Sequence, residues 1–200
     1  MFSVVFASNN LHKLLEVKQA FTAKDWDIKS QADFKVPSVA ETGLTFVENA
    51  LIKARHAAAY TELPVLADDS GLVVPALQGA PGVYSARYAG EHATAADNNA
   101  KLLAALTNYQ QHTERRAYFV CVMVLLQHAA DPLPVISIGN WHGEIAFEAS
   151  GHYGHGYDPI FYDPKLGRTA AELPLELKNT YSHRAKALHR LYHTITKLHQ

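Results

Sequence analysis

Hydrophobic and polar positions along the chain predict strands and helices in turn. Four stretches read as strands because they are short, apolar or alternating, and bounded by turn residues. They cover residues 3–7, 27–30, 117–127 and 135–147. Residues 117–127 are apolar on both faces, which predicts a central strand covered on both sides. The last stretch is expected to bend or break near Gly139 and Gly143.

Helices are indicated where apolar residues recur at a period near 3.6 behind a capping residue. The expected helices cover residues 11–21, 45–60, 93–106 and 182–199. Asn10 is the expected cap of the first helix and Ser182 that of the last. Thr45 and Glu48 form a capping box for the second helix.

One apolar run ends in two adjacent carboxylates. Residues 64–66 predict a short buried strand, Asp68 and Asp69 follow, and Ser70-Gly71 predicts a sharp turn before a strand at 72–74. Successive strand residues point to opposite faces, so the two acids are expected to do different jobs. They could be a metal ligand and a general base, or a solvated turn that caps its own backbone. These residues alone favour the second interpretation.

Composition narrows the class of protein. The chain has 200 residues and a net charge of -1, which fits one domain over residues 1–200 without a broad nucleic-acid or membrane-binding surface. Cys121 is the single cysteine, so an intramolecular disulfide is excluded. Apolar runs are too short to span a bilayer, and the cytoplasm is the expected compartment.

Cations lie near the starts of expected helices. Lys13 and Arg184 oppose the helix dipole unless an anion lies beside them, and Lys53 follows in the second helix. The junction before Lys13 resembles the strand-to-helix geometry that binds phosphate through backbone N–H groups. Residues 151–159 form a glycine-rich aromatic loop on which a flat ring could stack. Together with the acids, these features suggest a metal–nucleotide site.

Six segments, taken in order, resemble the inosine/xanthosine triphosphate pyrophosphatase family, whose enzymes remove non-standard purine nucleotides. The resemblance covers nearly the whole chain. The segments lie at residues 8–13, 41–50, 67–72, 81–88, 154–159 and 182–184. The resemblance implies an α/β fold, elongated and two-lobed, around a long mixed β-sheet flanked by helices. It also implies a homodimer that uses Mg²⁺ to hydrolyse ITP, dITP and XTP to the monophosphate and pyrophosphate, which cleanses the nucleotide pool.

The same resemblance implies roles for individual residues. Asp69 matches the proton acceptor for the attacking water, and Glu41 with Asp69 matches the metal ligands. The triphosphate is expected on Ser8, Asn9, Asn10, Leu11, His12 and Lys13, with Lys13 as the cation. The other substrate positions begin with Ser70, which matches a substrate contact. His155, Gly156, Tyr157 and Asp158 match the lining of the base and sugar region, and Lys178, His183 and Arg184 match positions that hold the base. An Arg side chain only donates hydrogen bonds, so Arg184 can pair with a six-oxo purine and not with the adenine amino group.

Two positions depart from the family pattern. Asn9 stands where Gly is common, and Asn is expected to tolerate an unusual backbone angle there. His155 stands where Phe is usual, and an imidazole still stacks but offers less apolar area.

Two other functions stay open at this point. A related Maf-like pyrophosphatase would act on modified triphosphates, but His183-Arg184 and the 154–158 loop argue against it. The second is a nucleotide-binding regulator without turnover. Such a protein would not need a water-activating acid, so the presence of Asp69 together with Glu41 and Lys13 argues against it.

Overall fold

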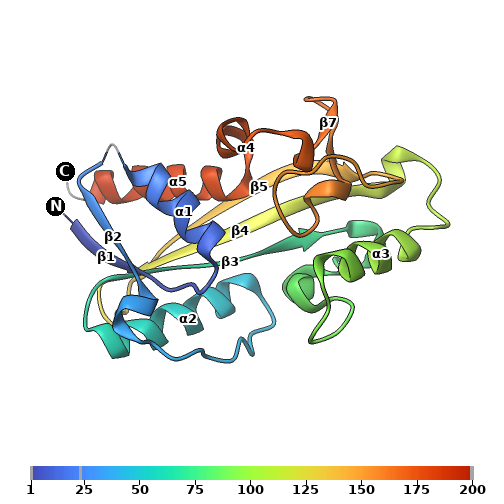
Figure 1. Ribbon diagram of the computed structural model, residues 1–200. Helices are drawn as coiled ribbons and strands as arrows, with labels where there is room; N and C mark the ends of the chain where they lie inside the picture. The colour runs from blue at the N-terminus through green and yellow to red at the C-terminus, as the bar shows by residue number, and fades with distance from the viewer. Residues whose placement is uncertain (1, 23, 199–200) are drawn as a thin grey trace. The chain divides into compact units, whose positions relative to one another are not determined.

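The computed structural model describes residues 2–22 and 24–198 and shows an α/β fold with a mixed seven-stranded sheet (Figure 1). The strand order is β2-β1-β3-β4-β5-β6-β7. The strands are β1 (Phe2–Phe6), β2 (Trp26–Ser30), β3 (Val65–Val73), β4 (Arg116–Leu126), β5 (Val135–Ile145), β6 (Phe161–Asp163) and β7 (Arg168–Thr169). β1 is parallel to β2 and β3, whereas β6 is antiparallel to β5 and β7. The expected fold class, α/β with a mixed sheet, is confirmed.

The helices are α1 (Leu11–Phe21), α2 (Phe46–Thr61), α3 (Ala95–Ala105), α4 (Leu175–Tyr181) and α5 (His183–Leu198). The expected ends of the first three agree with the structure to within two residues. α5 begins directly after the expected cap, Ser182, and His199 lies outside the described residues. α4 was not predicted, and none of the described helices is long and apolar enough to cross a membrane.

Contacts divide the chain into two compact units, which are described separately. The first unit takes the chain up to Asp69, then Cys121–Gly139 and the chain from Arg184 onward. The second unit takes Ser70–Val120 and Asn140–His183.

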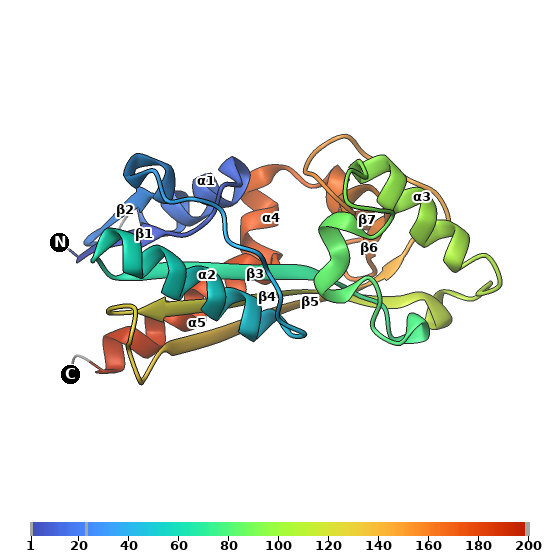
Figure 2. The ribbon, with the colours of Figure 1, turned by 90° about the horizontal axis from the view of Figure 1, so that it is seen from below.

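In the first unit, α1 and α5 cover one face of the sheet and α2 covers the other (Figures 1 and 2). α1 and α5 bury Leu14, Val17 and Leu188 in one cluster with Phe6 and Leu66 of the strands. The buried face of α2 consists largely of Ala residues. Small side chains let this helix approach the sheet closely, so Lys53, near the middle of the helix, can reach Asp69 of β3.

Local capping signals explain where α1 and α2 begin. Asn10 Oδ1 accepts hydrogen bonds from the backbone N–H groups of His12 at 3.0 Å and Lys13 at 3.2 Å. Thr45 Oγ1 accepts from the Glu48 N–H, and the Glu48 carboxylate accepts from the Thr45 N–H in return. Both caps are as predicted.

Two predicted interruptions of strands are wrong. β3 runs without a break through Asp68, Asp69, Ser70 and Gly71, so these residues form no turn. The acids stay in the sheet because cations approach them from both faces, as described below. β5 is also continuous, and Gly143 serves close packing instead, since a Cβ there would collide with the Tyr162 carbonyl and the Phe161 ring.

The second unit has its own core. It gathers Leu72, Leu102, Trp141, Ile145 and Phe161, all buried. Trp141 Nε1 donates to Asp163 Oδ2 at 2.7 Å, which satisfies the indole N–H inside the core. The short strands β6 and β7 were not predicted, because two or three residues show no measurable period.

Candidate active site

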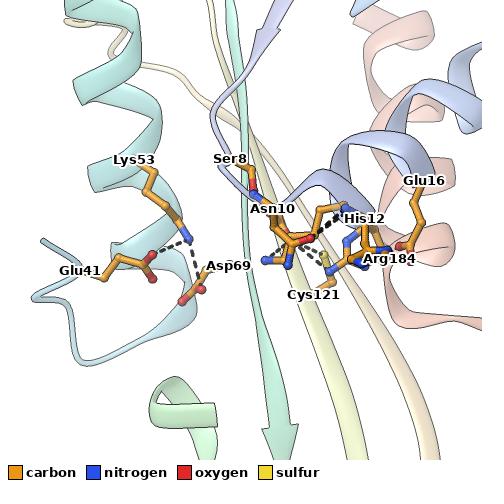
Figure 3. Close-up of polar contacts among 11 residues, drawn as sticks. Ser8, Asn10, His12, Glu16, Glu41, Lys53, Asp69, Cys121 and Arg184 are labelled. Atoms are coloured by element: carbon orange, nitrogen blue, oxygen red, sulfur yellow. Dashed lines mark hydrogen bonds and ion pairs between the residues drawn. The ribbon is translucent and has the colours of Figure 1, made fainter. Parts of the chain in front are cut away.

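Strand β3 presents its two acids to opposite faces of the first unit. Asp68 Oδ2 lies 2.9 Å from Lys13 Nζ and 3.4 Å from Arg184 Nη2. Asp69 Oδ1 lies 3.3 Å from Lys53 Nζ. Figure 3 shows Lys53 and Arg184 on opposite sides of β3. The expected alternation is therefore confirmed: Asp68 faces α1 and α5, and Asp69 faces α2.

Asp68 is the centre of a buried ion cluster. Arg184 pairs with Asp68 and also with Glu16, whose Oε2 lies 2.5 Å from Nη1. Burial alone would raise the pKa of Asp68, but Lys13 and Arg184 outweigh it and hold that pKa well below its usual range. Burial opposes the charge of Arg184, yet Asp68 and nearby groups raise its pKa. Both groups are therefore charged at neutral pH.

Cys121 lies against the same cluster. Its thiol donates to Asp68 Oδ2 at 3.8 Å, and its side chain is fully buried. Burial raises the Cys121 pKa to about 12, with Asp68 adding to the shift. The thiol thus stays protonated and acts as a weak donor.

On the other face, Lys53 joins two carboxylates. Its Nζ lies 3.2 Å from Glu41 Oε1 and 3.3 Å from Asp69 Oδ1. Burial disfavours the ammonium, but Asp68, Asp69 and Glu41 outweigh it and raise the Lys53 pKa. Burial raises the pKa of Asp69, and Lys53 opposes this only in part. A carboxylate with a raised pKa is the better proton acceptor.

Glu41 and Asp69 form a donor set suited to a hard divalent cation. Within residues 2–22 and 24–198, no group of three or more His, Cys, Asp or Glu side chains could hold a metal. Mg²⁺ is usually bound by one or two carboxylates and completes its shell with water and substrate phosphates. Glu41 and Asp69 both contact the Lys53 ammonium, so the two carboxylates suit an Mg²⁺ ion that is bound together with the nucleotide.

The predicted phosphate loop is locally ordered. Ser8 Oγ accepts a hydrogen bond from the Asn10 N–H at 3.2 Å. The side-chain oxygen of Asn10 accepts from the backbone N–H groups of His12 and Lys13. Leu11 and His12 are exposed. Lys13 reaches Asp68 from the first turn of α1, so its charge has the anionic neighbour that its position requires.

Asn9 does not adopt the unusual backbone angle that was expected at this position. The described non-glycine residues with positive φ are Lys35, Glu62 and Gln78. The side chain of Asn9 instead accepts from Gln31 Nε2 at 2.7 Å and donates to Ser38 Oγ at 3.2 Å. It thereby ties the loop before α1 to the segment that leads to Glu41.

The predicted base-binding residues lie mainly in the second unit. Asp158 Oδ2 accepts from the His155 N–H at 2.7 Å and from Lys178 Nζ at 2.5 Å, and both charged side chains are buried. The His183 ring stacks on Phe119 at a centroid distance of 4.9 Å. Ser70 is half-buried in β3. Asp158 and Lys178 thus form a buried ion pair with each other.

The sequence assigns no partners to two charged residues of the first unit: Glu16, which pairs with Arg184, and Lys53, which joins Glu41 and Asp69 on the other face. Lys53 is expected only as a cation of the second helix, and nothing in the local pattern singles out Glu16. The signal for Lys53 was its place on α2, one turn after Asn49, which itself accepts from the Gly43 N–H beside Glu41. The signal for Glu16 was weaker, because its partner lies 168 residues further along the chain.

The model of the Ham1 family matches residues 4–194. The chain belongs to the Ham1 family. This Ham1 protein is 56% identical over 191 residues to a protein of Xylella fastidiosa named dITP/XTP pyrophosphatase, covering 96% of each chain. It is 55% identical over 191 residues to the protein of that name from Erwinia tasmaniensis, covering 96% of this chain and 93% of the other.

Solved structures agree with the family. A HAM1 protein from Coxiella burnetii matches with a TM-score of 0.92 and 50% identity, covering 98% of this chain and 100% of that one. The Staphylococcus aureus Ham1 protein matches with a TM-score of 0.86 and 42% identity, covering 98% of each. The resemblance found from the motifs is thereby confirmed.

Proposed function

We propose that this Ham1 protein hydrolyses dITP, ITP and XTP to the monophosphate and pyrophosphate and so removes deaminated purine nucleotides from the nucleotide pool. The observation that carries the proposal is the acid pair on β3, with Lys13 on one face and Lys53 and Glu41 on the other. It occurs in a chain 56% identical to a protein named for this activity. The family match favours this reading over a Maf-like enzyme.

Asp69 is the residue that accepts the proton of the attacking water in this proposal. Its raised pKa supports the role, and Lys53 stabilises the ionised form that must be present before the proton moves. Lys13 supplies positive charge to the phosphate oxygens from the first turn of α1. Asp68 holds Lys13 in place and does not take the proton, because its lowered pKa makes it a poor base.

Glu41 and Asp69 would hold Mg²⁺. When bound, the ion neutralises charge that develops on the phosphate oxygens. The proposal is completed by the triphosphate positions Ser8 to Lys13, the substrate contact Ser70, and the base and sugar positions His155 to Asp158. The positions that hold the base are Lys178, His183 and Arg184. Ion pairs with Glu16 and Asp68 fix the orientation of the Arg184 guanidinium group, which supports its role as an oriented hydrogen-bond donor to the base.

We also infer one functional domain over residues 1–200, a homodimer, and a place in the cytoplasm, where nucleoside triphosphates are made and used. The homodimer comes from the family resemblance, whereas the single domain and the cytoplasm come from the length and composition of the chain.

The experiment is pyrophosphate release with Mg²⁺ from dITP, XTP, dATP and dGTP in parallel. We expect strong release from dITP and XTP and little from dATP. Asp69→Asn should abolish turnover while nucleotide binding persists, and Asp27→Asn, a change at a half-buried acid of β2 outside the proposed site, should leave turnover unchanged. Equal turnover by Asp69→Asn and the unaltered protein would refute the proposed base, and release from no triphosphate would refute the function.

A further inference from the structure

Two residues of the second unit fasten the loop proposed to line the base, although no role has been assigned to them. Asn99 of α3 donates from Nδ2 to the Gly156 carbonyl at 3.1 Å. Ser85 accepts a hydrogen bond from the Tyr157 hydroxyl through its backbone carbonyl at 2.8 Å. Consecutive loop residues are thus tied to two different segments.

Ser85 is itself held firmly. Its Oγ accepts from the Leu72 N–H at 2.9 Å and donates to the Gly82 carbonyl at 2.6 Å. The Tyr157 hydroxyl donates to the backbone carbonyl of Ser85. Substituting the Ser85 side chain would therefore not remove this hydrogen bond directly. Asn99, in contrast, reaches the loop through its own carboxamide, which makes it the testable residue of the two.

The carboxamide of Asn99 is not explained by stability. Its Oδ1 is buried and has no hydrogen-bond partner in the described part of the chain. A buried acceptor without a partner costs about 1–3 kcal/mol, whereas one hydrogen bond contributes about 1 kcal/mol. The bond to Gly156 therefore gives the protein little or no net stability, and an apolar side chain of similar size would serve packing equally well.

The loop needs an outside constraint. Gly154 and Gly156 flank His155 with φ angles of 76° and 64°, in the region that glycine reaches readily. Glycine can adopt many other backbone conformations, so without further hydrogen bonds the loop could adopt several conformations. The carboxylate of Asp158 fixes the His155 N–H, and Asn99 fixes the carbonyl of Gly156.

We propose that Asn99 is a positioning residue for base recognition: its carboxamide selects the conformation of residues 155–158 in which the loop receives the base. The inference rests on the proposed function, which places the base against this loop. Because the loop is assigned to the base and sugar and not to the phosphates, its loosening should weaken substrate binding and leave the chemical step nearly unchanged. That pattern raises KM and spares kcat.

The test compares Asn99→Leu with Asn108→Leu, the same change at an exposed position of the second unit. We expect Asn99→Leu to raise KM for dITP about threefold to tenfold, as the loss of one hydrogen bond predicts, with kcat within about twofold. The preference for dITP over dATP should fall by a similar factor. Asn99→Asp keeps the shape but loses the donor, so it should show the same defect, and Asn108→Leu should show none.

A second readout does not depend on turnover. Hydrogen exchange of the backbone amides at 154–158 should be faster in Asn99→Leu than in Asn108→Leu, while Tm changes little. Faster exchange with raised KM supports the proposal; unchanged exchange, or unchanged KM and base preference in a folded Asn99→Leu, overturns it. An unaltered protein that releases no pyrophosphate refutes the proposed function, and overturns with it the base-recognition role, even if exchange shows that Asn99 orders the loop.

Discussion

Asp68→Asn keeps the shape of the side chain and removes the carboxylate that faces Lys13 and Arg184. At an effective dielectric constant near 20, the two contacts at 2.9 and 3.4 Å are each worth about 5 kcal/mol of attraction. Desolvation of the buried ions offsets most of this. Breaking such a cluster by removing one partner costs about 3–5 kcal/mol, because the remaining charge is left without compensation.

The structure places the expected loss at the lower end of that range. Glu16 stays 2.5 Å from Arg184 and still neutralises it, and the new amide oxygen can accept one hydrogen bond from a cation. We therefore expect Asp68→Asn to lower the free energy of unfolding by about 3 kcal/mol. For a chain of this length, that corresponds to a fall in Tm of about 6–12 °C.

The pH dependence gives the sharper test. The folded pKa of Asp68 lies below its unfolded value, which is about 3.9. Its contribution is therefore fully present above the unfolded pKa and is lost as the pH falls toward the folded pKa. The stability difference between the unaltered protein and Asp68→Asn should be constant from about pH 5 to 7 and shrink below about pH 4.

Urea unfolding followed by circular dichroism at pH 7, 5 and 3.5 measures this difference. Asp27→Asn is the control, since Asp27 is only half-buried, its contact with Lys29 is 3.7 Å long, and the new amide oxygen can still accept the hydrogen bond from the Ser3 hydroxyl. We expect the control to change stability by less than about 0.5 kcal/mol. A loss below about 1 kcal/mol in Asp68→Asn at pH 7, or the same loss at pH 3.5 as at pH 7, would refute the reasoning.

Two further predictions concern other contacts. Lys53→Met leaves Glu41 and Asp69 without their shared cation, so the pKa of Asp69 should rise further and the acidic limb of the kcat/KM profile should move to higher pH; an unmoved limb would contradict the role of Lys53. Gly143→Ala puts a methyl group against the Tyr162 carbonyl, so it should lower the free energy of unfolding by about 1–3 kcal/mol in urea titrations, and an unchanged midpoint would show that β6 can move away.

The parts of the fold that follow from local signals could be predicted from the sequence. Asn10 and the Thr45–Glu48 box place two helix starts, because capping involves only neighbours in the chain. The alternation of Asp68 and Asp69 follows from strand geometry alone. The turn at Ser70-Gly71 was wrong because local propensity favours it, while the cations that keep the acids in the sheet lie far away in the sequence.

The candidate site shows the same limit. Arg184 reaches Asp68 across 116 residues, and no periodic pattern announces that pairing. Lys178 and Asp158 each read as substrate contacts, yet the structure pairs them with each other. Family resemblance supplied the residue types, but the pairing of Lys178 with Asp158 arises only in the folded chain.

The unbroken course of β3 limits how this protein can evolve. Because the two acids are adjacent on a strand, inserting or deleting a single residue just before them would exchange the faces to which they point. Asp68 would then meet α2, and Asp69 would meet α1 and α5, so both ionic clusters would be lost in one event. Point substitutions can adjust either acid separately, but changes of length are tolerable only in the loops outside β3. Lineages of this protein should therefore vary in length around this strand and never within its acidic half.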